Sequence, residues 1–173
     1  MAEGFERRLA GVRDDQWAAS TPCTDWDVRA LVSHVIATHE RVASTVSGST
    51  PQEVDTDGDL VAQWSAARAS ITGALDDPDR ASKTISGMFG EQPFESLVGR
   101  LLCSDTLFHT WDLARATGQD EQLDEEAVRK AMEFLEPIDE AIRRPGGFAP
   151  KISAPDDASA QTRFLTFGGR AVS

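Results

Sequence analysis

Hydrophobic positions recur at three- and four-residue spacing over most of the chain, a pattern that predicts α-helices. The clearest run follows Thr24-Asp25, whose side-chain oxygens suit a helix N-cap, and it ends at the turn formers of residues 47–51. Its apolar positions are Val28, Leu31, Val32, Val35, Ile36, Val42 and Val46. This run predicts an amphipathic helix over about residues 26–46.

The same spacing predicts further helices elsewhere in the chain. They cover about residues 5–17, 59–75, 94–116 and 124–144, with a short helical tail near 158–167. Pro137 predicts a kink or a break in the last long helix, and residues 84–86 predict a short extended piece. Because long helices dominate and strand signal is weak, we expect an all-α fold, an antiparallel four-helix bundle with an additional short C-terminal helix. Residues 1–173 are expected to form one domain.

Charge and composition exclude several classes of protein. With 17 Lys and Arg against 29 Asp and Glu, the net charge is −12, so we expect no binding to nucleic acid. Apolar stretches are far shorter than the about 20 residues that cross a bilayer, so no membrane insertion is expected. The N-terminal residues carry acids where a secretory signal has bases, which predicts a cytoplasmic protein. Its two cysteines are then expected to be free thiols.

Polar residues interrupt the apolar stripe of the helix predicted over 94–116. Asp105, His109 and Asp112 follow one another at spacings of four and three, so their side chains share one helix face. Burying a carboxylate and an imidazole costs several kcal/mol unless each has a partner. A divalent cation would supply that partner, since both groups are good metal ligands. A buried Asp–His hydrogen bond with a structural role is the alternative interpretation.

A metal site on this helix needs a ligand from a second helix, and two histidines are candidates. His34 and His39 both lie in the helix predicted over 26–46. The helical pattern places His39 near the centre of the apolar stripe and His34 at its flank. Periodicity alone favours His39, but a flank position faces the neighbouring helix in a bundle. Both histidines therefore stay open as ligands at this point.

Two segments resemble a known family. Trp26–His34 (WDVRALVSH) and Asp105–Leu113 (DTLFHTWDL) resemble the metal-binding domain of mycothiol-dependent maleylpyruvate isomerases. They are also similar to the small actinobacterial proteins built from that domain alone, which belong with the DinB/YfiT-like metalloenzymes. The resemblance covers about residues 21–118 and implies a DinB-like bundle that binds a divalent metal.

Carried over residue by residue, the resemblance implies His34, Asp105 and His109 as metal ligands. The isomerases have a glutamate where Asp105 stands, one methylene longer. The implied metal is zinc, with nickel as the alternative. The resemblance implies for Asp112 a role as acceptor for an imidazole N–H, or as a base. His39 is expected beside the site, as a substrate contact or as part of the core.

An open position on such a metal implies activation of a thiol for attack on an electrophilic carbon. The resemblance then implies a mycothiol-dependent transferase or isomerase, with a small thiol and an electrophile as partners. We expect no isomerisation of maleylpyruvate itself, because the roughly 30 residues after position 144 are too few for the isomerase's C-terminal domain. The alternatives are a non-catalytic bundle that binds a small molecule or a partner, with homodimerisation left open, and a metal-dependent hydrolase.

Cys23 is a separate candidate for chemistry. It precedes the predicted helix over 26–46 and follows Pro22. A helix N-terminus lowers the pKa of a nearby thiol, which favours a reactive cysteine. Simple packing in the loop is the alternative.

Overall fold

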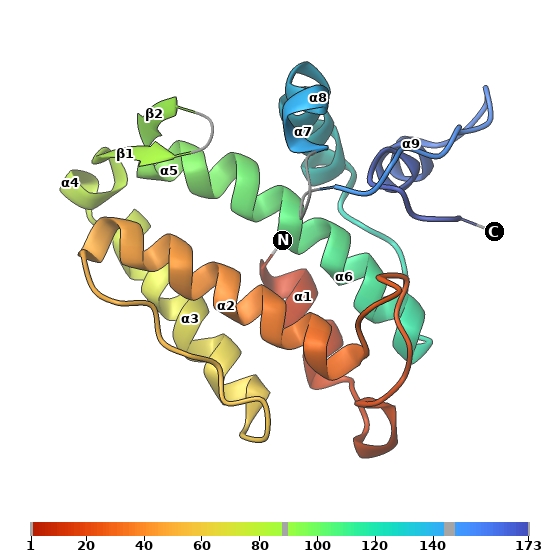
Figure 1. Cartoon of the computed structure of the whole chain (residues 1–173), viewed down its shortest axis with the longest axis horizontal. Coiled ribbons are helices and arrows are strands. Elements are labelled where there is room, and N and C mark those ends of the chain that lie inside the picture. Colours follow the sequence, from red (N-terminus) through yellow and green to blue (C-terminus); the bar gives the residue numbers. More distant parts are fainter. Residues whose placement is uncertain (1, 88–89, 144–147, 173) are drawn as a thin grey trace.

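Helices make up most of the structure. The computed structural model describes residues 2–87, 90–143 and 148–172 (Figure 1). The α-helices are α1 (Ala2–Ala10), α2 (Val28–Ser47), α3 (Leu60–Leu75), α4 (Pro78–Ala81), α5 (Phe94–Leu97), α6 (Cys103–Thr117), α7 (Glu125–Leu135), α8 (Asp139–Ile142) and α9 (Ala160–Phe167). Tighter or wider turns join some of them, namely the 3₁₀ segments η1 (Asp14–Gln16) and η3 (Glu136–Ile138) and the π-helix η2 (Val98–Leu102). The predicted all-α character is confirmed, with one small hairpin added.

Local capping explains where α2 begins and ends. Asp27 is its N-cap, and the carboxylate accepts a hydrogen bond from the Ala30 N–H at 2.8 Å. At the other end Gly48 takes a left-handed conformation with φ of 73° and donates its N–H to the Ser44 carbonyl. The N-cap predicted at Thr24-Asp25 is wrong, since Asp27 holds that position. The predicted helix over 26–46 still comes within two residues of the observed bounds, because the signals at both ends are local in sequence.

Three predicted helices differ in detail from the observed ones. The first is shorter than expected, since α1 ends at Ala10 and a 3₁₀ turn follows. The predicted helix over 94–116 is continuous but carries the π-helical turn η2 in its first half, immediately before the polar residues of α6. The predicted helix over 124–144 breaks at η3, which contains Pro137, because proline cannot donate the backbone hydrogen bond that a helix needs there.

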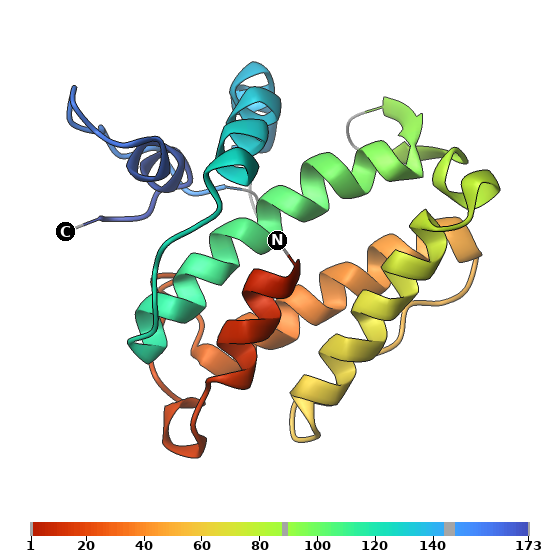
Figure 2. The same cartoon turned by 180° about the vertical axis from the view of Figure 1, so that it is seen from behind.

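Helix α6 lies at the centre of the arrangement. Helix α2 packs against α3 and α6, while α1 packs against α6 and α3, as the two opposite views show (Figures 1 and 2). On the other side of α6 stands α7, which in turn packs against α9. Because neighbours cover α6 on several sides, most of its residues are buried whether they are polar or apolar.

Within the residues that the structure describes, the hydrophobic core has three parts, one under each set of packed helices. The first joins α1, α2 and α3 and is built around Phe5, Leu31, Val35, Ile36 and Trp64. The second joins α6 to α7 and α9 through Leu107, Phe108, Trp111, Leu135, Phe164 and Leu165. The third closes the far end of α2 and α3 with Val42, Ile71, Phe94 and Leu102. These apolar contacts bring the polar faces of α2 and α6 together.

A short hairpin occupies the end of the molecule near α5. Strand β1 (Thr84–Gly87) pairs antiparallel with β2 (Gly90–Pro93), with Ile85 opposite Gln92. This hairpin contains the extended piece predicted over residues 84–86. In the described part of the chain, every helix is too short or too polar to pass through a bilayer.

Candidate metal centre

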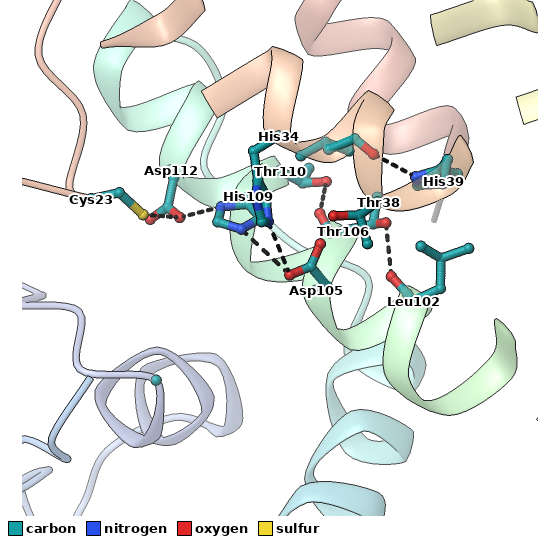
Figure 3. A network of polar contacts seen from close by, with 12 residues as sticks. Cys23, His34, Thr38, His39, Leu102, Asp105, Thr106, His109, Thr110 and Asp112 are labelled. Carbon is teal, nitrogen blue, oxygen red and sulfur yellow. Dashed lines mark hydrogen bonds and ion pairs between the residues drawn. The ribbon is translucent and has the colours of Figure 1, made fainter. Parts of the chain in front are cut away.

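Three side chains from two helices converge between α2 and α6. Figure 3 shows His34 of α2 directed at Asp105 and His109 of α6. Asp105 Oδ1 lies 3.6 Å from His34 Nε2 and 3.5 Å from His109 Nε2. One ligand atom from each residue lies within 4.8 Å of the other two. The structure thus brings together the three residues that the family resemblance assigned to the metal.

The two distances suit ligands that share an ion better than they suit hydrogen bonds. An N–H···O hydrogen bond spans about 2.7–3.2 Å, which is shorter than either distance. Two ligand atoms that each lie 2.0–2.1 Å from a tetrahedral zinc ion are about 3.4 Å apart. The observed 3.5 and 3.6 Å are close to that separation. This comparison argues against the interpretation of Asp105 and His109 as a simple buried hydrogen bond.

The second carboxylate oxygen of Asp105 lacks a hydrogen-bond partner in the described part of the chain. Asp105 Oδ2 is buried and has no hydrogen-bond partner among the residues that the structure describes. A buried polar atom without a partner costs about 1–3 kcal/mol, and more when it carries charge. A cation bound between Asp105 and the two imidazoles would offset that cost. The residues therefore fit a divalent metal by charge, by atom type and by spacing.

Asp112 holds the opposite side of the His109 ring. His109 Nδ1 lies 3.0 Å from Asp112 Oδ2, and the Asp112 side chain has no exposed surface. An ionised carboxylate can only accept, so Nδ1 donates and Nε2 is left directed at Asp105. A carboxylate that fixes the tautomer of a ligand histidine is the usual companion of a zinc site. Asp112 thus lies where it can accept an imidazole N–H, as the family resemblance implied.

Charges in the cluster shift the pKa values of Asp105, His109 and Asp112. Burial disfavours the charged form of every group here, yet the opposite charges outweigh it. The negative charge of Asp105 and the hydrogen bond to Asp112 raise the pKa of His109 well above its ordinary value. The pKa of Asp105 is held below its usual range by the charge of His109, and that of Asp112 by hydrogen bonds from His109 and Arg170. The cluster therefore favours ionised carboxylates next to a positive charge.

Burial falls from one end of the cluster to the other. The exposed fraction of the side chain is 0% for Asp112 and 7% for His109, but 24% for Asp105 and 29% for His34. The deep end is thus closed by protein, and the shallow end reaches solvent. A ligand from outside would approach the cluster from the side of His34 and Asp105.

Trp26 packs over both histidines. Its ring centroid lies 4.5 Å from that of His34 and 5.7 Å from that of His109. The loop that carries it is tied back on itself, since Thr21 Oγ1 donates to the Trp26 carbonyl at 2.8 Å. The half-buried indole lies against both imidazoles, with its plane tilted by 35° from that of His34 and by 46° from that of His109. Trp26 belongs to the first motif of the family resemblance, but the sequence did not indicate that it packs against the two histidines.

Two further residues extend the cluster beyond Asp112. Cys23 Sγ lies 3.3 Å from Asp112 Oδ2, and Arg170 contacts both, with Nη2 at 2.7 Å from Asp112 Oδ2 and 3.3 Å from Cys23 Sγ. A second group has the atom types and the spacing of a metal site when Arg170 is left out of account, namely Cys23, His109 and Asp112. The Arg170 guanidinium supplies the positive charge there, so this group needs no ion. Of these two residues, the sequence pattern indicated Cys23 and gave no signal for Arg170.

His39 lies apart from the cluster (Figure 3). Its imidazole is buried, donates from Nδ1 to the Val35 carbonyl at 2.9 Å and packs edge-on against Trp64. Burial lowers the pKa of His39, against smaller opposing effects of the Val35 carbonyl and of Asp105. Of the two histidines of α2, the one at the flank of the apolar stripe faces α6, and the one at its centre packs in the core.

Comparisons with known proteins agree with this geometry. Two uncharacterized proteins of Mycobacterium tuberculosis, MT0763 of strain CDC 1551 / Oshkosh and Rv0738 of strain ATCC 25618 / H37Rv, are each 34% identical to this chain over 172 residues. The match covers 98% of this chain and 93% of each relative. No solved structure matches the chain. The family model of the mycothiol maleylpyruvate isomerase N-terminal domain matches residues 1–114, which include all three candidate ligands. The chain therefore belongs to the mycothiol maleylpyruvate isomerase N-terminal domain family.

Proposed function

We propose that this protein binds a divalent metal, zinc in the first place, through His34, Asp105 and His109. The fold is then a DinB-like antiparallel four-helix bundle whose site lies between α2 and α6. The observation that carries the proposal is Asp105, whose Oδ1 lies 3.5–3.6 Å from two imidazole nitrogens while its buried Oδ2 has no partner in the described residues. Two neutral imidazoles and one carboxylate form a common ligand set for zinc.

We further propose that the site works on a small thiol, as the family relationship suggests. A bound zinc ion with an open position lowers the pKa of a coordinated thiol, so that the thiolate is available at neutral pH. The partner would be an electrophilic carbon, and the reaction a transfer or an isomerisation. Mycothiol is the first candidate, with bacillithiol and glutathione as alternatives.

The residues around the ligands have separate tasks in this proposal. Asp112 accepts the Nδ1 proton of His109 and so keeps Nε2 free to ligate. Trp26 lies against both imidazoles and excludes water on that side. The shallow end at His34 and Asp105 admits the thiol, since the Asp112 end is closed.

Metal content tests the first part. Untagged protein, purified without added metal, is analysed for zinc and nickel together with His109→Ala and His39→Gln variants. We expect stoichiometric metal in the wild type and in His39→Gln, which keeps the cluster intact, and none in His109→Ala. Wild-type protein without metal, or a His109→Ala variant with full content, would contradict the proposal.

Thermal unfolding tests the second part. Mycothiol, bacillithiol and glutathione are added to the zinc-loaded and to the metal-stripped protein, and the unfolding midpoint is recorded. A ligand that binds only the folded state raises the midpoint. We expect one of the thiols to do so in the loaded protein alone. Equal shifts with and without zinc, or none with any thiol, would exclude a metal-bound thiol.

A further inference from the structure

We propose that Arg170 is a positioning residue for His109 and that the C-terminal segment of this chain completes the metal centre. The inference rests on the proposed metal-binding function and adds to it a residue from outside the family match, which ends at position 114. It assigns a task to residues 160–170 at a site whose ligands all come from α2 and α6.

Short polar contacts join Arg170 through Asp112 to His109, the proposed metal ligand. The guanidinium donates two hydrogen bonds to the Asp112 carboxylate, from Nε to Oδ1 at 3.1 Å and from Nη2 to Oδ2 at 2.7 Å. The same Oδ2 accepts from His109 Nδ1 at 3.0 Å. With both oxygens engaged, the Asp112 carboxylate has little freedom to rotate. The orientation of the His109 ring thus depends on Arg170 through one carboxylate.

Backbone geometry at the end of α9 aims Arg170 at this carboxylate. The Arg170 N–H bonds the Leu165 carbonyl at 2.9 Å, and the Gly169 N–H bonds the Thr166 carbonyl at 3.0 Å, which together form a Schellman motif. Gly169 supplies the left-handed residue that the motif needs, with φ of 79°. A Cβ at Gly168 would lie 2.3 Å from the Phe108 ring, so only glycine permits this close approach to α6.

The ion pair between Arg170 and Asp112 is buried and therefore differs from an ion pair on the surface. The side chain of Arg170 is 11% exposed and that of Asp112 is fully buried. The Arg170 guanidinium also lies over the Phe108 ring, 4.9 Å from its centroid, and donates from Nη1 to the Gly168 carbonyl at 2.7 Å. These contacts leave one orientation for the guanidinium. A rigid support of this kind is what a ligand histidine requires from its surroundings.

Variants of Arg170 test the proposal. Arg170→Gln removes the charge, and Arg170→Lys keeps the charge but cannot bond both oxygens of Asp112 as a guanidinium does. Arg163→Gln is the control, since the Arg163 side chain is exposed, lies in α9 and donates hydrogen bonds to the exposed carbonyls of Ala158 and Asp156. Zinc affinity is measured by competition with a chelator, and Co²⁺ substitution reports the ligand field from its visible spectrum. In the metal-free protein, ¹⁵N NMR follows the Nδ1–H group of His109 and the exchange of its proton with water.

We expect Arg170→Gln to weaken zinc binding by about 10-fold, the lower end of the effect of removing supporting partners. Arg170→Lys should restore part of the affinity, Arg163→Gln should equal the wild type, and the Co²⁺ spectrum should change only in Arg170→Gln. Faster exchange of the His109 Nδ1 proton should accompany the loss. Wild-type affinity together with an unchanged His109 spectrum in Arg170→Gln would overturn the proposal.

The NMR measurement separates the two proposals from each other. If the wild type holds no metal, the proposed function fails, while a loosened His109 in metal-free Arg170→Gln still supports the positioning role. If the wild type binds zinc and neither readout moves in Arg170→Gln, only the positioning role fails. Should Arg170→Gln not fold, the comparison of Arg170→Lys with the wild type decides by the same two readouts.

Discussion

Arg170 and Asp112 form a two-bond ion pair across 58 residues of sequence, with heavy-atom distances of 3.1 and 2.7 Å. The pair ties the segment after α9 to the buried middle of α6. Because Asp112 also accepts from His109, packing of the C-terminal segment and order at the candidate metal centre are linked.

Removal of Asp112 should destabilise the metal-free protein. Asp112→Ala leaves the buried guanidinium of Arg170 without its partner, and breaking a buried pair in this way costs about 3 kcal/mol. The double variant Asp112→Ala/Arg170→Met should lose less than the sum of the two single variants. Urea unfolding at pH 7 measures all three, with Glu126→Ala as the control, since the Glu126–Arg129 pair is exposed and should contribute little. Additive losses would show that the pair is not coupled.

Substitutions of Asp105 should separate its charge from its length. Asp105→Asn keeps the shape but removes the negative charge that a divalent cation needs, so we expect at least a 10-fold loss of zinc affinity. Asp105→Glu restores the side chain that the isomerases have here and should retain zinc. Asp25→Asn changes an exposed carboxylate and serves as the control. Chelator competition checks each variant, and equal affinities for Asp105→Asn and the wild type would contradict Asp105 as a ligand.

His39 should make the protein sensitive to mild acid. Burial lowers its pKa in the folded state, so below about pH 6.5, the ordinary value, the unfolded chain binds the proton more readily than the folded one. The free energy of unfolding therefore falls as the pH decreases from about 6.5 toward the folded-state pKa, and above 6.5 His39 has no effect.

In His39→Gln this contribution is absent, so the loss of stability between pH 7 and pH 5 should be smaller than in the wild type. Urea unfolding at several pH values measures the difference. The cluster histidines and carboxylates are the same in both proteins, so their contributions cancel in the comparison. Parallel pH profiles of the two proteins would refute a buried neutral His39.

Glycine substitutions should test the turn after α9. Gly48 and Gly169 both have positive φ, but the space around Gly48 is open, whereas a Cβ at Gly169 would lie 2.7 Å from Ala149 Cβ. Gly48→Ala should cost about 1–2 kcal/mol from backbone strain alone, and Gly169→Ala should cost more. Only Gly169→Ala should also weaken zinc binding, because it displaces Arg170. Thermal unfolding and chelator competition distinguish the two, and equal effects would argue against a special role for this turn.

Much of the fold follows from local sequence. Three-and-four spacing of apolar residues, the turn formers of residues 47–51 and the break at Pro137 predict the main helices, because each signal acts within one or two turns. The N-cap of α2 was predicted at Thr24-Asp25 and lies at Asp27 instead. The shortened α1 and the π-helical turn η2 were not predicted. Both depend on how α1 and η2 pack against other helices, and the spacing of apolar residues carries no information about that packing.

Part of the candidate site is equally local. Asp105, His109 and Asp112 share a helix face by spacing alone, and their burial among leucines signals a partner for them. The choice between His34 and His39 is different, because the apolar stripe of a helix reports which residues are buried and not which ones meet another helix. The family resemblance selected His34, and the packing of α2 on α6 places it beside Asp105.

The contacts of Arg170 and Trp26 at the candidate site could not be predicted from the sequence. Arg170 contacts Asp112 and Trp26 contacts His109, and the two residues of each pair are more than 50 positions apart in the sequence. The residues next to Arg170 and Trp26 in the sequence do not indicate these contacts. The sequence alone determines the main helices and the polar face of α6, since helical hydrogen bonds join residues close in sequence. Which histidine, which tryptophan and which arginine surround that face was decided by the packing of helices, since only packing joins residues distant in sequence.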